Sequence, residues 1–141
     1  MNEQKPVLSS ILAGALLPGA VLALAASAPL VNDPFITPVD GRILTLGWWF
    51  MVPLGTALAV MRSWRAWSGV AVGVWSAVAF HLSMVLTAPE AERAAMIWSS
   101  DSIITALITV VMPWAIGMAL GLTSVEHQRR KHGGSAAQGT A

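Results

Sequence analysis

His81 is the histidine of this chain that lies inside a long apolar segment, so its side chain is the first candidate for chemistry. Imidazole titrates near physiological pH and binds metals and haem. The last apolar segment carries Asp101, Thr105 and Thr109 at intervals of four residues. Residues four apart share one side of a helix. We therefore treat these four residues as a candidate polar site.

The chain that positions this site is strongly apolar. Of its 141 residues, 55% are hydrophobic and 11% are charged, whereas soluble domains carry about 25% charged residues. The net charge of +1 gives no reason to expect a nucleic acid partner. The absence of cysteine excludes disulfides, thiolate metal sites and cysteine nucleophiles. This composition is typical of a polytopic membrane protein in contact with the lipid bilayer.

Four apolar runs, at residues 7–31, 43–61, 68–88 and 102–122, are each long enough to cross a bilayer. A crossing helix needs about 20 residues, and unpaired backbone is not tolerated in lipid. The expected fold is all-α: an up-down four-helix transmembrane bundle over residues 1–125 and a flexible cytoplasmic tail over residues 126–141. We expect the first run to be an uncleaved span, because it exceeds the apolar core of about 7–15 residues in a secretory signal.

Basic residues indicate the orientation, because lysine and arginine are retained on the cytoplasmic side. With the N-terminus inside, that side holds Lys5, Arg62, Arg65, Arg129, Arg130 and Lys131. The outer loops hold Arg42 and Arg93. Both termini are therefore expected in the cytoplasm, in a bacterial inner membrane. Apart from Lys5, the cytoplasmic basic residues are expected to contact lipid headgroups, each contributing about 1 kcal/mol.

The loop between the third and fourth runs is expected to contain a short outer interfacial helix. Thr87 and Glu90 fit a capping box. One helix over residues 89–122 would be about 51 Å long and exceed the bilayer. A break near Ser99–Asp101 is therefore predicted, with the serines capping the next helix.

Small residues recur on all four spans and are expected to bring the helices close together. In membranes such residues let helix backbones approach one another. The predicted packing positions are Gly14, Gly55, Gly69, Gly73, Ala77, Gly117 and Gly121.

Three interpretations of His81 follow: a structural side chain, a proton or ion carrier, and a haem or metal ligand. Pro53 and Pro113 free the carbonyls of Trp49 and Thr109. At 1.5 Å per residue, both carbonyls lie near the depth of His81. We expect neutral His81 to be buried and to donate to one of them or to the Thr109 hydroxyl.

The sequence contains no recognisable catalytic motif, so we expect neither an enzyme nor a bound cofactor or metal ion. HExxH and glycine-rich phosphate motifs are absent. We expect an accessory or assembly subunit of a larger membrane complex, or a self-associating protein. One alternative is a small proton- or ion-coupled carrier or channel that uses His81 and Asp101. Another is a haem-bearing redox subunit, for which a second chain supplies the other axial histidine.

Overall fold

The computed structural model describes residues 7–31 and 41–138, which form helices joined by short turns. The helices are α1 (Val7–Val31), α2 (Gly41–Ser63), α3 (Ala66–Thr87), α4 (Glu90–Ile97) and α5 (Ser100–Gln138). Four of them, α1, α2, α3 and α5, are long and apolar enough to cross a membrane. The protein is therefore a small polytopic membrane protein, and the expected all-α bundle is confirmed.

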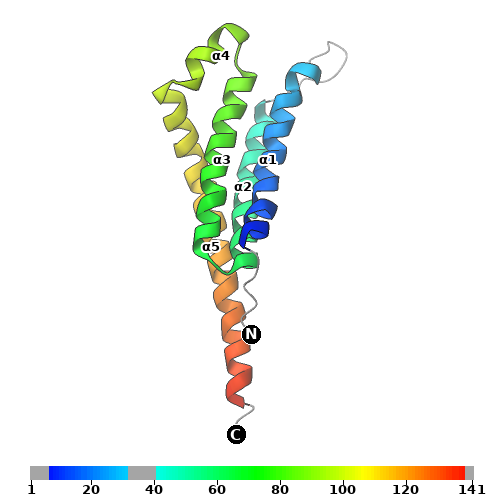
Figure 1. Ribbon diagram of the computed structural model, residues 1–141, viewed down its shortest axis with the longest axis vertical. Coiled ribbons are helices and arrows are strands. Elements are labelled where there is room, and N and C mark those ends of the chain that lie inside the picture. Colours follow the sequence, from blue (N-terminus) through cyan, green and yellow to red (C-terminus); the bar gives the residue numbers. More distant parts are fainter. Residues whose placement is uncertain (1–6, 32–40, 139–141) are drawn as a thin grey trace.

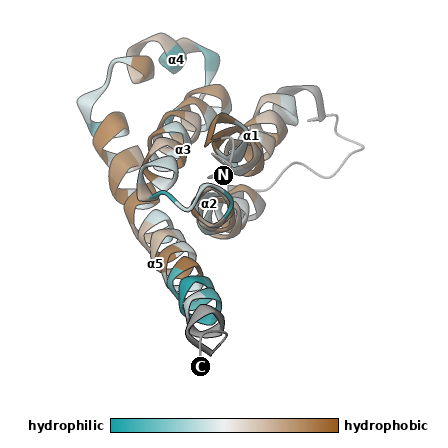
Figure 2. Ribbon diagram, turned by 60° about the horizontal axis from the view of Figure 1, so that its bottom comes forward, coloured by the Kyte–Doolittle hydropathy of each residue, from teal (hydrophilic) through white to brown (hydrophobic). Residues whose placement is uncertain are grey.

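The four long helices run alternately up and down, and α4 lies at one end of the bundle (Figure 1). The α2–α3 hairpin forms the centre. Helix α1 packs on both members of this pair, and α5 packs on the same two helices. Figure 2 shows α1 and α5 on opposite sides of the hairpin. The bundle therefore has a rhombic cross-section with α2 and α3 across its short diagonal.

The α2–α3 turn consists of Trp64 and Arg65 and is held by two serines. Trp64 adopts a positive φ of 58°, and its backbone N–H donates to the Val60 carbonyl at 2.8 Å. The hydroxyls of Ser63 and Ser68 lie 2.6 Å apart across the turn, and both are buried. These hydrogen bonds satisfy polar groups that are buried inside the protein, where an unpaired hydroxyl would be costly.

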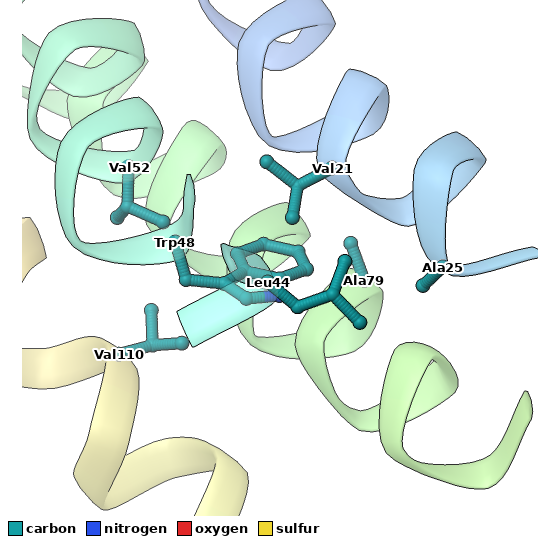
Figure 3. Close-up of a cluster of buried hydrophobic side chains, with 7 residues drawn as sticks. All are labelled: Val21, Ala25, Leu44, Trp48, Val52, Ala79 and Val110. Carbon is teal, nitrogen blue, oxygen red and sulfur yellow. The ribbon is translucent and has the colours of Figure 1, made fainter. Parts of the chain in front are cut away.

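A cluster of buried side chains joins all four long helices (Figure 3). Its members are Val21, Ala25, Leu44, Trp48, Val52, Ala79 and Val110. The Trp48 ring meets Phe80 of α3 edge-on, with centroids 5.3 Å apart and planes at 76°. Such aromatic pairs contribute about 0.5–1.5 kcal/mol beyond the area they bury.

Glycines set the closest helix contacts. Gly14 of α1 faces Gly55 of α2, and a Cβ on either residue would meet the carbonyl oxygen of the other. A Cβ on Gly117 of α5 would lie 2.6 Å from the Pro53 carbonyl oxygen. A Cβ on Gly121 would lie 2.8 Å from the Cβ atom of Val60. Helix α2 therefore meets both α1 and α5 at positions without room for a side chain.

The predicted break before the last span is confirmed, but the predicted capping box is wrong. Helix α4 ends at Ile97 and α5 begins at Ser100, with the Ser99 hydroxyl accepting from the Ser102 N–H at 3.5 Å. The Thr87 hydroxyl instead donates to the Ser83 carbonyl of its own helix at 2.9 Å. The Thr87 hydroxyl therefore bonds within α3, and the N-terminus of α4 has no side-chain cap.

Helix α5 continues to Gln138, so residues 126–138 are helical, whereas the sequence predicted a flexible cytoplasmic tail over residues 126–141. Residues 139–141 lie outside the described part. Arg130 Nε donates to Glu126 Oε1 at 3.0 Å, one turn apart. Such pairs support a helix by about 0.3–0.5 kcal/mol. Because the transmembrane part already forms the helix, the polar segment extends it without a new nucleation cost.

Candidate functional site

His81 joins α3 to the junction between α4 and α5. Its Nε2 lies 3.2 Å from the Ile97 carbonyl oxygen, and its Nδ1 lies 3.1 Å from the Ser102 hydroxyl. A carbonyl oxygen can only accept, so Nε2 carries the proton in this bond. With the proton on Nε2 alone, Nδ1 is an acceptor for the Ser102 hydroxyl. Both ring nitrogens are therefore used within the chain.

These partners differ from the predicted ones, which were the carbonyls of Trp49 and Thr109 and the Thr109 hydroxyl, and the His81 side chain is half-buried, not buried as expected. The depth comparison assumed that neighbouring spans begin and end at equal heights. Helix α3 continues beyond His81 to Thr87, whereas α4 folds back and α5 begins below the end of α3 (Figure 1). The first turn of α5 therefore lies beside His81.

The other members of the candidate polar site do not gather around His81. The Thr105 hydroxyl donates to the Asp101 carbonyl, and the Thr109 hydroxyl donates to the Thr105 carbonyl, both at 2.7 Å. Asp101 is exposed. These side chains therefore bond along their own helix and form no shared site with the imidazole.

A drift in helical phase explains this difference. Four residues turn a helix by about 400°, so each step of four rotates the position by about 40°. The buried face of α5 instead follows steps of four with one step of three, through Ser102, Ala106, Val110, Pro113, Gly117, Gly121 and Val125. Ser102 is the polar residue that the strict spacing of four missed, and this mixed spacing would have identified it.

A groove runs between α3 and α5, and we call it the α3–α5 groove. Its upper part has a volume of about 280 Å³ and includes His81, Ile97, Trp98 and Ala106. Its lower part has a volume of about 190 Å³ and includes Gly73, Val74, Val111 and Trp114. Ala77 and Leu107 line both parts. The walls are almost entirely apolar, because the lining residues other than His81 are aliphatic, tryptophan or glycine residues. Both nitrogens of His81 are hydrogen-bonded within the chain.

Two tryptophans also donate to main-chain carbonyls of a neighbouring helix. Trp114 of α5 bonds the Gly69 carbonyl at 2.9 Å, and its ring lies over Gly73. Trp75 of α3 bonds the Ala15 carbonyl at 3.1 Å. Each indole thus ties its own helix to another, and Trp114 closes the lower end of the α3–α5 groove.

The basic residues expected at lipid headgroups are exposed and lie at the end of the bundle opposite α4. Arg62 lies in the last turn of α2 and Arg65 lies in the α2–α3 turn. Arg129, Arg130 and Lys131 lie on the extension of α5. Within residues 7–31 and 41–138, no three histidine or acidic side chains gather as metal ligands would. A haem or metal ion at His81 would have to displace one of its two hydrogen bonds.

No family model, curated protein or solved structure matches this chain. The site is therefore interpreted from its own geometry. It consists of a hydrogen-bonded junction at His81 and an apolar groove below it.

Proposed function

We propose that this chain is a non-catalytic subunit that associates with other helices in the membrane, either as an accessory or assembly subunit of a larger complex or as a homo-oligomer. The observation that carries the proposal is the extension of α5 beyond the bundle. Side chains 126–133 are all exposed, and the helix continues to Gln138. Figure 1 shows this segment projecting past the other helices.

The composition of the extension supports a partner. Gly133 and Gly134 interrupt it, and each glycine costs a helix about 1 kcal/mol relative to alanine. Helical segments of this length are marginal in water when they pack on nothing. Contact with a helix of another subunit would offset that cost. The positive-inside distribution of arginine and lysine supports placing this contact in the cytoplasm.

A truncation series tests the proposal. The full chain, a chain ending at Val125 and a control ending at Gln138 are purified in nanodiscs, and their masses are measured. The full chain and the control are expected to form a homo-oligomer or to retain a membrane subunit in fixed ratio. The chain ending at Val125 should be monomeric and unaccompanied.

A crosslinker placed at one site defines the contact. A cysteine in place of Gly133 gives a unique attachment point for the crosslinker, because the unmodified chain contains no cysteine. Crosslinks from this position to a single partner sequence are expected. A full chain that stays monomeric and free of any stoichiometric subunit would overturn the proposal.

A further inference from the structure

The shape and lining of the α3–α5 groove restrict what can occupy it. Its two parts have volumes of about 280 and 190 Å³, and their lining is almost entirely apolar. Small residues, including Gly73, Ala77 and Ala106, line it. Such a lining favours an apolar occupant over a polar one.

The groove is closed at its α4 end. Ile97 and Trp98 line this end, and the Ile97 carbonyl is tied to His81 of α3. A transmembrane helix of another protein would have to pass this junction in order to cross the membrane. A hydrocarbon chain that ends near the middle of the bilayer can enter the groove without passing this junction.

The groove opens sideways, toward the surrounding lipid. Val78, Ile103 and Leu107 line it and remain 47%, 40% and 50% exposed. At its α4 end the Trp98 side chain is 85% exposed. Indoles favour the headgroup level, where they meet both polar and apolar parts of a lipid.

We propose that the α3–α5 groove binds one acyl chain of a glycerophospholipid from the leaflet on the α4 side. The chain lies along Ala77 and Leu107 and ends near Trp114, and its headgroup lies beside Trp98. The carbon lining excludes a polar headgroup from the groove itself. This site is separate from the α5 extension, so it stands independently of the proposed function.

A photoreactive phospholipid tests this site. The probe is a phosphatidylethanolamine with a diazirine midway along one acyl chain, reconstituted with the full-length protein in nanodiscs. Labelling is expected at Val74, Ala77 and Leu107, well above labelling on the exposed face of α1. Ala77→Phe fills the groove and should lower labelling there by about tenfold. The matched control Ala20→Phe makes the same change at an exposed position of α1 and should leave groove labelling unchanged.

The wild-type labelling pattern keeps the test decisive even if Ala77→Phe fails to fold. Labelling spread evenly over all lipid-facing positions would overturn the proposal. So would labelling of the groove that Ala77→Phe leaves unchanged, or a crosslink from the groove to a second protein chain. Retention of one phospholipid per chain after delipidation of the wild type, and its loss in Ala77→Phe, would support it.

Discussion

At the scale of single residues, His81 is a junction between three helices. Its imidazole belongs to α3, its Nε2 contacts the last residue of α4, and its Nδ1 contacts the first turn of α5. Each hydrogen bond contributes about 0.5–1.5 kcal/mol, and bonds between membrane helices average about 0.6 kcal/mol. The histidine therefore ties α3 to the end of α4 and to the start of the fourth span.

His81→Ala is expected to lower the free energy of unfolding by about 1–2 kcal/mol, because two hydrogen bonds are lost. Reversible unfolding in mixed detergent micelles measures this change. His127→Ala is the matched control, because that side chain is exposed on the α5 extension, and should have no effect. Nitrogen-15 NMR should find the Nε2–H tautomer at neutral pH, and a ring protonated on Nδ1 alone would contradict the assignment.

Thr56 shows the opposite situation, a buried hydroxyl that has no hydrogen-bond partner in the described structure. Its side chain is 0% exposed, and its Cβ and methyl group face Gly117 and Gly69. Thr56→Val keeps the shape and removes the unpaired group. We expect it to raise the free energy of unfolding by about 1 kcal/mol.

The same unfolding assay measures the effect of Thr56→Val. Thr56→Ser is the control, because it keeps the hydroxyl and removes the packed methyl group, and should be destabilising. A loss of stability in Thr56→Val comparable to that in Thr56→Ser would show that the hydroxyl is bonded.

At the scale of helices, the close approach of α1 and α2 depends on Gly14 and Gly55. We expect Gly14→Ala to lower the free energy of unfolding by about 1–3 kcal/mol, because the added methyl group meets the Gly55 carbonyl. Gly19→Ala is the matched control on the same helix. The nearest atom to its added Cβ, Nε1 of Trp75, lies 4.0 Å away, so this change should be neutral or slightly stabilising. Equal effects of the two variants would contradict the packing.

The helices were predictable from sequence because the bilayer imposes their length, and α1, α2 and α3 agree with the expected runs within a few residues. Helix α5 begins close to its expected start but continues well past residue 122, to Gln138. The contacts between helices were harder to predict. Strict steps of four placed Asp101 on the same face as Gly121, although phase drift turns them apart by about 200°. The ends of neighbouring helices also do not lie at equal heights in the bundle, because α4 folds back and brings Ser102 to the level of His81. The spacing of residues in the sequence predicts neither the tilt of a helix nor the path of a loop.

At the scale of the whole molecule, charge is distributed unevenly between the two ends. Within the described part of the chain, the end that carries the α2–α3 turn and the α5 extension holds five basic residues and one acidic residue, Glu126, whereas α4 at the other end carries Glu90, Glu92 and Arg93. The five basic residues are Arg62, Arg65, Arg129, Arg130 and Lys131. Basic residues are retained in the cytoplasm. This distribution favours a cytoplasmic α5 extension and an external α4.

Single-cysteine labelling tests this orientation on a chain that naturally lacks cysteine. Cysteine in place of Ala94, which is exposed on α4, should react with a membrane-impermeant maleimide on intact spheroplasts. Cysteine in place of Gly133 should react only after permeabilisation. The unmodified chain is the control for background labelling, and the reverse pattern would invert the orientation.

The central position of the α2–α3 hairpin also bears on how the molecule is made. Helices α1, α2 and α3 all pack on one another, so a three-helix unit is available as soon as α3 leaves the ribosome. Helix α5 is synthesised last and meets two partners that are already in place. Its release would uncover one side of the hairpin and leave the contacts among the first three helices intact. Assembly can therefore proceed in the order of synthesis, with α5 added to a hairpin that α1 already covers on its other side.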